Sequence, residues 1–269
     1  MITASIVTYH NNHDELIKAI NSFLNSKLEI KLYISDNSSN KEIEKLCNEN
    51  RVKYIYNSAN LGFGKGHNIA IKEAIKDGSK YHLILNPDIF FDVGVIEELY
   101  EYMEKNENIG LTMPRVLYPN GEIQRLCKLY PSPINLIFRR FIPFKTVKEK
   151  MDYDYEMKFF DYNSIREIPI LSGCFMFVDV KKFEKIGMFD ENIFMYMEDF
   201  DLCRRFRDAG YRLIYYPELT ITHKFEKGSF KNKKLLQYHI KSAIYYFNKW
   251  GWIFDKKRRI VNKNAKNQK

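Results

Sequence analysis

Hydrophobic and polar residues alternate in blocks along the first hundred residues. Apolar runs rich in β-branched and aromatic residues are each followed by a segment whose apolar residues recur at helical spacing. The segment 14–26 is an example, with Leu16, Ile20 and Phe23 on one face and Asp14 near its start. The pattern predicts strands at 2–10, 31–39, 52–57 and 80–88, and helices at 14–26, 40–50, 66–78 and 93–106.

This alternation of strands and helices predicts an α/β fold. Its core is a Rossmann-like, mostly parallel sheet flanked by helices on both faces. In such sheets ligands bind at the carboxyl ends of the strands. The predicted strand ends are polar or glycine-rich, at 8–11, 36–39, 57–66 and 86–88. We therefore expect the functional site at this edge.

The second half of the chain is less regular. Between Pro114 and Pro169 the pattern lapses into a mixture of proline, aromatic and basic residues, with a helical portion at INLIFRRF. Long irregular segments of this kind either face a substrate or are disordered. Beyond it, the pattern predicts a strand at 168–180, a helix at 198–210 closed by glycine, and one or two strands at 211–225. The tail from 235 begins as a helix and ends as a basic, frayed segment.

Composition and charge narrow the class of protein. The 269 residues suffice for one large domain with an appendage. A balance of 43 Lys and Arg against 34 Asp and Glu favours anionic partners such as nucleotides, nucleic acid or acidic lipid. No stretch resembles a signal peptide or a membrane span, and the four cysteines form no CxxC pair. We expect a cytoplasmic protein with reduced thiols.

The tripeptide Asn86-Pro87-Asp88 follows the apolar run of the fourth predicted strand. A single carboxylate at a strand end can hold Mg²⁺ or Mn²⁺ while a diphosphate supplies further oxygen ligands. The alternative is an Asx-Pro turn that caps the next element.

Glycines cluster in Asn60–Asn68, before the third predicted helix. They permit close backbone approach to an anion at the helix N-terminus, although a tight structural turn explains them equally well.

Acidic residues open the helix at 198–210. Glu198 and Asp199 are either capping residues favoured by the helix dipole or a carboxylate general base. Arg204 or Arg205, one turn later, is placed to steady that base or a phosphate. His223 ends an apolar strand and is a structural histidine unless Asp88 already holds a metal.

Taken in order, these segments resemble the inverting family 2 glycosyltransferases of the GT-A fold, especially the bacterial rhamnosyltransferase-like branch. The resemblance runs from about Ile6 to Ser229. The matching segments are SIVTYHN, ISDNSSN, NLGFGKGHNIAI, LILNPDI, LSGCFMFVDVKKFEKIGMFDENIFMYMEDFDLCRRFRDAGYRLIYYPE and THKFEKGS.

The resemblance implies roles for individual residues. Asn86–Asp88 looks like the family's DxD motif with Asn in place of the first Asp, which removes one negative charge and leaves Asp88 as the metal ligand. His223 completes metal coordination or contacts the diphosphate, and Asp199 is the catalytic base with Glu198 beside it. The nucleotide-sugar positions implied are Thr8, Tyr9 and Asp36 for base and ribose, and Asn60, Gly62, Gly66 and Asn68 for the sugar-nucleotide pocket.

The implied reaction is metal-dependent inverting sugar transfer with Mg²⁺ or Mn²⁺. The donor is dTDP-rhamnose or a UDP-sugar, and the acceptor is a hydroxyl of a saccharide or polyprenyl-linked saccharide in bacterial surface polysaccharide synthesis. Residues 1–230 form the GT-A domain, with a nucleotide-binding half at 1–110 and an acceptor-binding half at 111–230. Residues 231–269 form a C-terminal helix and basic tail.

The tail itself allows two interpretations. Six aromatic residues precede the basic run 256–259, an arrangement suited to the cytosolic face of a membrane or to a helix packed on the domain with a solvated basic end. They are Tyr245, Tyr246, Phe247, Trp250, Trp252 and Phe254.

Two rival functions predict features that this sequence lacks. A sugar-phosphate nucleotidyltransferase needs a glycine-rich loop with arginine after the first strand, where YHNNHDE stands. A nucleic-acid-binding protein needs clustered cations with exposed aromatics, but outside the tail and Arg139–Arg140 the charge is dispersed. We therefore expect no nucleic-acid partner.

Overall fold

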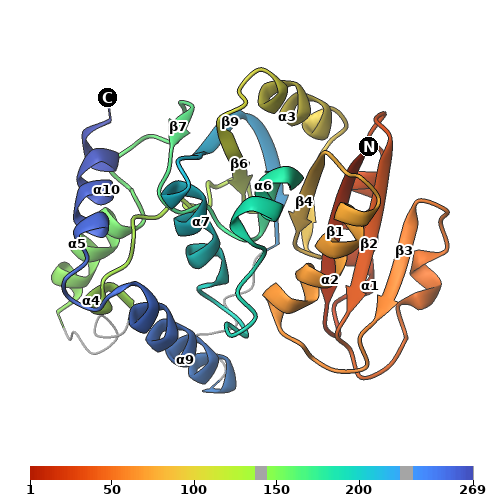
Figure 1. Ribbon diagram of the computed structural model, residues 1–269, viewed down its shortest axis with the longest axis horizontal. Helices are drawn as coiled ribbons and strands as arrows, with labels where there is room; N and C mark the ends of the chain where they lie inside the picture. The colour runs from red at the N-terminus through yellow and green to blue at the C-terminus, as the bar shows by residue number, and fades with distance from the viewer. Residues whose placement is uncertain (137–143, 225–232, 269) are drawn as a thin grey trace.

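One nine-stranded sheet organises the chain in the computed structural model, which describes residues 1–136, 144–224 and 233–268 (Figure 1). The strands are β1 (Ile2–Thr8), β2 (Ile30–Asp36), β3 (Val52–Tyr56), β4 (Tyr81–Leu85), β5 (Ile89–Phe90), β6 (Ile109–Leu117), β7 (Arg166–Glu167), β8 (Phe175–Asp179) and β9 (Arg212–His223). The helices are α1 (His13–Leu24), α2 (Phe63–Lys76), α3 (Val95–Glu104), α4 (Pro133–Leu136), α5 (Lys145–Tyr155), α6 (Val180–Ile186), α7 (Glu198–Asp208), α9 (Lys233–Trp250) and α10 (Lys256–Asn267).

The sheet is parallel in its first half and mixed in its second. The order is β3-β2-β1-β4-β8-β6-β9-β5, with β7 beside β9. β1 pairs in parallel with β2 and β4, and β3 pairs in parallel with β2, as predicted. β8 runs antiparallel to both β4 and β6, and β5 and β7 run antiparallel to β9, whereas β6 and β9 pair in parallel. β1–β4, β6 and β9 therefore share one direction, and the prediction of a mostly parallel sheet is confirmed. The chain reaches β8 through the irregular segment instead of a strand–helix crossover, so no parallel direction is imposed.

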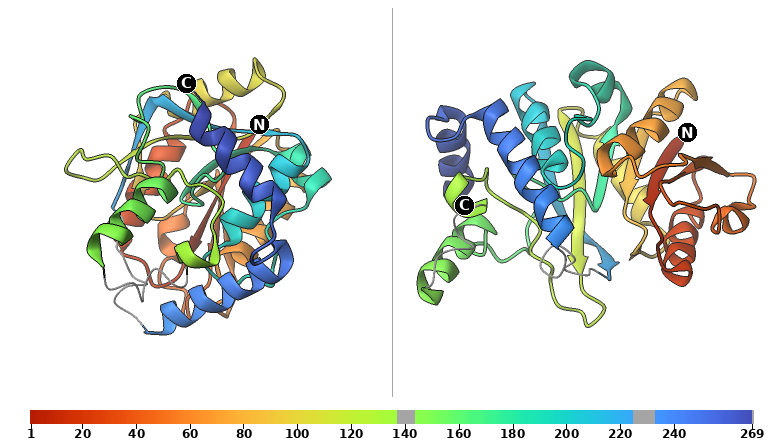
Figure 2. Two further views of the ribbon diagram at one scale, coloured as in Figure 1. Left: turned by 90° about the vertical axis from the view of Figure 1, so that its left-hand side faces the viewer. Right: turned by 90° about the horizontal axis from the view of Figure 1, so that it is seen from below.

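Helices cover both faces of the sheet, with α1 and α2 on opposite sides of β1–β4 in the right-hand view of Figure 2. α1 begins where the Asn12 side chain accepts hydrogen bonds from the backbone N–H groups of Asp14 and Glu15. Its apolar face, including Leu16 and Phe23, is buried against the sheet. The predicted flanking of the sheet by helices is confirmed.

One prediction of local structure in the first half is wrong, and one strand escapes prediction. The segment 40–50 contains only a 3₁₀ turn at Glu44–Cys47, because Ile43 and Cys47 alone are buried there, too few apolar residues to stabilise a helix. β6 does not stand out in the sequence because Pro114 interrupts it; in the structure a register shift at Pro114–Arg115 accommodates the proline. Of the helical portion INLIFRRF, residues 137–141 lie outside the described part.

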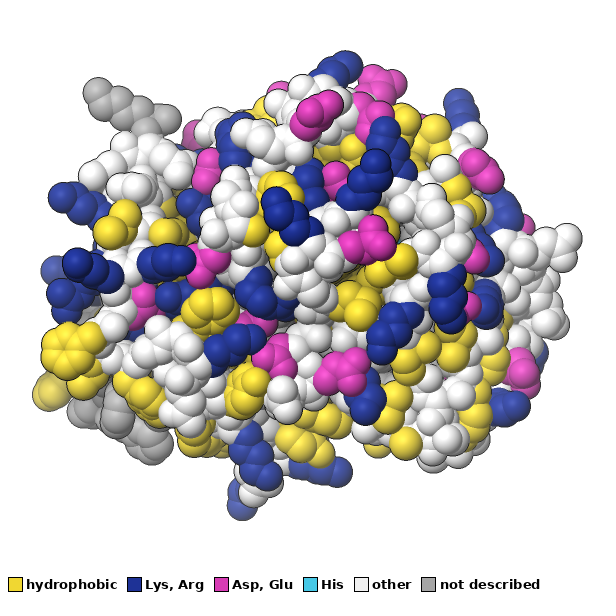
Figure 3. All heavy atoms as spheres, viewed as in Figure 1, with side chains coloured by type: hydrophobic (Ala, Val, Ile, Leu, Met, Phe, Trp, Pro, Cys, Tyr) yellow, Lys and Arg dark blue, Asp and Glu magenta, His cyan; other side chains and the backbone are white. Residues whose placement is uncertain are grey.

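The C-terminal segment also differs from expectation. Instead of fraying, residues 256–267 form α10, which starts at Asp255, whose side chain accepts from the Arg258 backbone N–H. Tyr246 and Phe247 of α9 are buried against the domain. In Figure 3, dark blue Lys and Arg side chains are spread over the whole visible face, including its left side, where α10 lies. The four cysteines are free and buried, as predicted.

A buried ion pair fastens this segment to the domain. The Arg204 guanidinium of α7 donates two hydrogen bonds to the Asp255 carboxylate, at 2.7 and 2.9 Å, and 4% and 3% of the two side chains are exposed. Bidentate geometry and exclusion of water make such a pair costly to break, because one charge would remain buried alone.

Asp255→Ala should therefore lower the free energy of unfolding by about 3 kcal/mol at pH 7. Burial opposes ionisation of Asp255, but hydrogen bonds from Arg204 outweigh it and hold the pKa below its usual value. The pair contributes stability above the unfolded pKa of about 4, and the contribution is lost as pH falls. Denaturant titrations between pH 3 and 7 measure this, with Lys257→Ala, which removes an exposed pair to Asp208, as the control. Equal losses for both variants would contradict the assignment.

Candidate active site

The ends of β1 and β2 form a polar pocket. Thr8 and Asp36 are register partners, and the Thr8 hydroxyl donates to Asp36 Oδ1 (3.0 Å). The Tyr54 hydroxyl donates to Asp36 Oδ2 (2.7 Å). Half-exposed Tyr9 follows Thr8. The pocket beside them is lined by His10, Asn11, His13, Asp36, Ser38, Asn40, Glu42 and Ile43.

Asn86-Pro87-Asp88 leaves β4 toward the same edge of the sheet. The Asn86 backbone N–H donates to the Cys174 carbonyl (2.9 Å). The next strand, β5, pairs with the end of β9, with Ile89 opposite His223. This pairing brings Asp88 Oδ1 within 3.3 Å of His223 Nε2, so the two predicted metal ligands are neighbours despite lying far apart in the chain.

Gln124 fixes the orientation of the His223 ring. Its amide nitrogen donates to the backbone carbonyls of His223 (2.6 Å) and Leu117 (3.3 Å), which leaves Gln124 Oε1 facing His223 Nδ1 (3.0 Å). His223 Nδ1 therefore carries the proton in the neutral ring, and the Nε2 lone pair is directed toward Asn86 and Asp88.

The glycine-rich loop is fitted against the loop that precedes α7. Gly62 has a φ of +84°, and a Cβ there would lie 2.2 Å from the Phe194 carbonyl oxygen, so only glycine fits. The Asn60 side chain accepts from the Gly62 N–H (3.0 Å), and the Phe63 N–H donates to the Phe194 carbonyl (3.0 Å). A Cβ at Gly64 would lie 3.7 Å from that of Glu198. The start of α2 thus borders the acidic pair.

Gly66 and Asn68 contribute to packing instead. A Cβ on Gly66 would meet both Val7 methyl groups at 2.9 Å, so this glycine lets α2 approach β1. The Asn68 amide donates to the Phe189 carbonyl (2.9 Å) and accepts from its N–H (3.0 Å). Asn68 therefore holds the segment at Phe189, whereas Gly66 sets the distance between α2 and the end of β1.

Of the acidic pair at the start of α7, Glu198 is buried and Asp199 is partly exposed. Asp199 Oδ2 accepts from the Gly173 N–H (3.0 Å) and Oδ1 from the Phe200 N–H (2.9 Å). Burial raises the pKa of Asp199, and Lys128 together with these donors opposes the rise. Burial and the neighbouring Asp199 charge raise the pKa of Glu198 well above its usual value. Among the described residues, Glu198 Oε2 has no hydrogen-bond partner, whereas both Asp199 oxygens accept backbone hydrogen bonds, so Asp199 ionises before Glu198.

Gly173 and Cys174, just before β8, lie between the two acidic centres. Gly173 holds Asp199 through its N–H, and Cys174 holds Asn86 through its carbonyl. Burial raises the pKa of the Cys174 thiol to about 12, and the charges of Asp88 and Asp199 add to this. Adjacent backbone groups of Gly173 and Cys174 thus hold Asp199 on one side and the Asn86–Asp88 turn on the other.

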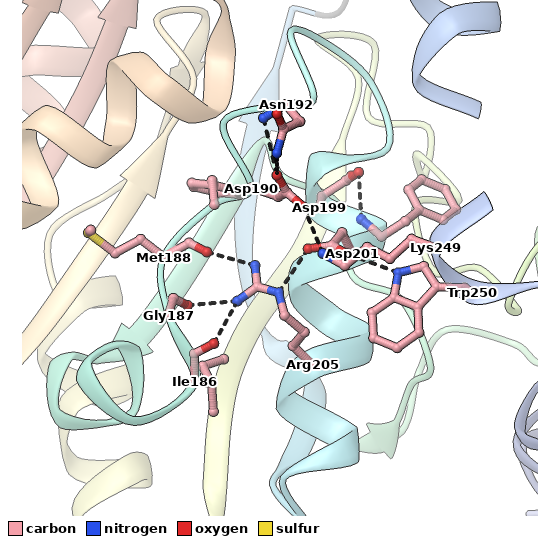
Figure 4. A network of polar contacts seen from close by, with 12 residues as sticks. Ile186, Gly187, Met188, Asp190, Asn192, Asp199, Asp201, Arg205, Lys249 and Trp250 are labelled. Carbon is pink, nitrogen blue, oxygen red and sulfur yellow. Dashed lines mark hydrogen bonds and ion pairs between the residues drawn. The ribbon is translucent and has the colours of Figure 1, made fainter. Parts of the chain in front are cut away.

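A second network fastens α7 behind the site (Figure 4). The buried Asp201 carboxylate accepts from Arg205 Nε (2.8 Å), Trp250 Nε1 (2.9 Å) and Lys249 Nζ (2.8 Å). Arg205 also donates to the carbonyls of residues 186–188.

The sequence predicts Arg204 at the nucleotide site; this is wrong, because its guanidinium is committed to Asp255. Neither arginine reaches a phosphate.

Three residues near the acidic groups are absent from the sequence predictions. They are Gln124, Lys128 and Gly173. The first two lie in the irregular segment, where no periodic pattern marks them. Of the three, only Gly173 carries a signal that can be read from the sequence, because it is a glycine directly before the apolar run of β8. In the structure a Cβ at Gly173 would lie 3.3 Å from that of Asp199.

Comparison with known proteins identifies the family of the chain. The model of the family "Glycosyl transferase family 2" matches residues 5–187, more than half of the chain. The chain belongs to glycosyl transferase family 2. Both the family and the enzyme class predicted from the sequence are thereby confirmed.

Relatives within family 2 align over different shares of their length. Rhamnosyltransferase WbbL of Escherichia coli is 26% identical over 270 residues, covering 96% of this chain and 95% of WbbL. The low-salt glycan biosynthesis hexosyltransferase Agl10 of Haloferax volcanii is 27% identical, covering 76% and 61%. The N-acetylglucosaminyl-diphospho-decaprenol L-rhamnosyltransferase of Mycobacterium tuberculosis is 28% identical, covering 64% and 58%. The chain thus spans about three fifths of the latter two proteins.

The fold of this family 2 member also has a solved counterpart. The crystal structure of GalNAc-T7 with UDP, GalNAc and Mn²⁺ superimposes with a TM-score of 0.63 at 15% identity, covering 82% of this chain and 42% of that one. The predicted GT-A fold is confirmed. No helix in the described part of the chain is long and apolar enough to cross a membrane.

Glu198→Gln should make the protein more stable than wild type at pH 7, by about 1 kcal/mol or more, because one unit of pKa shift corresponds to about 1.4 kcal/mol. A raised pKa means that the folded state holds a proton that the unfolded state has released, so wild-type stability falls as pH rises above the usual glutamate pKa. The gain should vanish near pH 4. Urea titrations at several pH values measure it, with exposed Glu122→Gln as the control; a gain independent of pH would contradict a protonated Glu198.

Proposed function

We propose that the chain is a metal-dependent, inverting glycosyltransferase that moves a sugar from a nucleoside diphosphate to an acceptor hydroxyl. The observation that carries this proposal is the placement of Asp88 and Asp199 on either side of Gly173–Cys174. A carboxylate at the carboxyl edge of the sheet and a partly buried carboxylate opposite it are what activation of a leaving group and of a nucleophile require.

Asp88 and His223 would hold the divalent cation, Mg²⁺ or Mn²⁺. They offer one carboxylate and one imidazole nitrogen, and the described residues contain no cluster of three metal-ligating side chains. A partial set of this kind fits a cation whose remaining positions are taken by diphosphate oxygens. When bound, the cation neutralises the negative charge that develops on the departing nucleoside diphosphate. Gln124 would keep His223 Nε2 unprotonated for this purpose.

Asp199 would accept the proton of the acceptor hydroxyl. The N–H groups of Gly173 and Phe200 hold its carboxylate in place, and protonated Glu198 adds no second negative charge beside it. As the hydroxyl oxygen bonds to the anomeric carbon, the bond to the diphosphate breaks on the opposite face and the configuration inverts in one step. Fixed positions of base and leaving group supply much of the acceleration.

The donor would lie along the N-terminal half of the sheet. Thr8, Tyr9 and Asp36 would hold base and ribose, because Asp36 lines a pocket, Thr8 donates to Asp36, and Tyr9 precedes His10 of the pocket lining. The Asn37 side chain, next to Asp36, donates to the Gly62 carbonyl (3.0 Å) of the glycine-rich loop. On this proposal residues 1–110 bind the nucleotide and 111–230 bind the acceptor, with 231–269 as an accessory segment.

The names of the relatives support a specific sugar and acceptor class. WbbL and the mycobacterial relative are named as rhamnosyltransferases, and the latter name specifies an N-acetylglucosaminyl-diphospho-decaprenol acceptor. We therefore infer dTDP-rhamnose, or failing that a UDP-sugar, as donor. The acceptor is a saccharide or polyprenyl-diphosphate-linked saccharide of bacterial surface polysaccharide synthesis.

Donor binding should raise the melting temperature in the presence of Mn²⁺ or Mg²⁺, because a ligand that binds only the folded state stabilises it. At a donor concentration of about 100 times Kd the gain is about 2.7 kcal/mol. A thermal-shift screen of nucleotide sugars with each metal and with EDTA measures this. Asp88→Asn should remove the metal-dependent part of the shift; a shift that survives EDTA undiminished would argue against a metal-held diphosphate.

Asp199→Asn should lower turnover by about 10²–10⁴-fold, the range for loss of a general base, while donor affinity stays within about threefold. The amide retains the size of the side chain but cannot accept the hydroxyl proton. Sugar transfer and donor titration measure the two effects separately. Exposed Asp161→Asn is the matched control, and wild-type turnover in Asp199→Asn would remove this residue from the mechanism.

A further inference from the structure

The C-terminal segment Lys233–Asn267 carries the net charge of the whole chain. It contains ten Lys and Arg but a single acidic residue, Asp255, which gives +9, equal to the net charge of all 269 residues. Asp255 is buried and paired with Arg204, so it does not offset the charge at the surface. In the described part of the chain, Lys241, Lys256, Arg259 and Lys263 are exposed and make no ion pair.

α9 presents an apolar stripe to solvent beside these cations. Ser242, Ala243, Tyr246 and Phe247 face the domain, whereas Ile240 and Ile244, one turn apart, are exposed on the outer face. Asn248 continues that face, and its side chain accepts a hydrogen bond from Trp252 Nε1 (2.8 Å). The stripe therefore runs on into the connection between α9 and α10.

That connection forms an apolar tip made of Trp252, Ile253 and Phe254. The Ile253 side chain is 67% exposed and Phe254 is 91% exposed. The tip is held rigidly, because Arg258 donates to the carbonyls of Trp252 and Ile253 (both 3.1 Å) and to that of Pro131 (3.3 Å). Asp255, immediately after the tip, is locked by Arg204. The side chains of Ile253 and Phe254 are therefore exposed in a backbone conformation that these hydrogen bonds fix.

We propose that the outer face of α9, the apolar tip and the exposed cations of α10 together form a docking surface for a bilayer containing anionic lipid. Isolated exposed apolar residues need no partner, but a fixed, exposed apolar tip directly before a run of exposed cations indicates one. Aromatic and aliphatic side chains enter the interface between headgroups and acyl chains while neighbouring lysines and arginines meet lipid phosphates. An acidic protein surface would match the charge but offers no hydrocarbon layer for Phe254 to enter.

The docking surface is joined directly to the candidate active site. The Ser242 hydroxyl of α9 donates to the Met195 carbonyl (2.8 Å), and Tyr238 packs on Phe194 (4.4 Å between ring centroids). Phe194 contacts Gly62, and Glu198–Asp199 follow shortly after. Docking through α9 would therefore hold the catalytic loop near the bilayer, where a lipid-linked acceptor presents its sugar. This last step rests on the proposed function; the docking itself does not.

Vesicle flotation with the full chain tests the proposal. Wild-type protein should float with vesicles of phosphatidylcholine containing about 30 mol% phosphatidylglycerol, and less with pure phosphatidylcholine or at high salt. The double variant Ile253→Ser/Phe254→Ser should bind at least about tenfold more weakly, since most of the buried apolar area is lost. Lys256→Ala/Arg259→Ala/Lys263→Ala should weaken binding to anionic vesicles alone, by about fivefold for each cation that contacts lipid.

Controls separate docking from folding and from catalysis. Val93→Ser removes an exposed apolar side chain elsewhere and should leave flotation unchanged. The tip variant should keep the wild-type melting temperature and donor-induced stabilisation, so its failure and that of the proposed function are distinguishable. Equal flotation of wild type and tip variant would overturn the proposal. The proposal would also be overturned if wild-type protein did not float and instead self-associated in a way that the tip variant abolishes. Failure to float combined with binding of an oligonucleotide would overturn it as well.

Discussion

The antiparallel insertion of β8 between β4 and β6 is the constraint on which the site depends. It carries Gly173 and Cys174 to the carboxyl edge of the parallel strands, where one holds Asp199 and the other holds Asn86. The groups that this segment contributes are both backbone groups, the Gly173 N–H and the Cys174 carbonyl. The separation between Asp199 and the Asn86–Asp88 turn is thereby tied to the sheet itself and to the rigidity of the core.

α7 serves the site at one end and the tail at the other. Its first residues are the acidic pair, while Asp201 and Arg204 bind Trp250, Lys249 and Asp255 of the C-terminal segment. A buried carboxylate held protonated at the helix start costs stability, and the buried pairs further along the helix offset that cost. The C-terminal helices are thus part of the support of the catalytic residues, although the family pattern ends at residue 187, before α7.

The sequence predicts the first half of the fold well because the information there is local. Apolar runs and helical spacing mark β1 to β4 and their helices, and the polar strand ends mark the pocket. Contacts between residues far apart in the chain leave no mark in a short stretch of sequence. Arg204 pairs with a residue 51 positions away, and Gln124 contacts His223 across 99 positions. β6 is missed for a different reason, because it contains a proline, which usually breaks a strand. Motifs identified the acidic groups, whereas the residues that orient them required the tertiary structure.

The fit of Gly62 against the Phe194 carbonyl has a consequence for the evolution of this scaffold. With 2.2 Å between a would-be Cβ and that oxygen, the glycine-rich loop and the segment before α7 cannot change shape independently. Any residue other than glycine at position 62 therefore demands a compensating movement of the segment before α7. A chimaera that places a larger residue at 62 must take residues 60–64 and 189–199 from the same source.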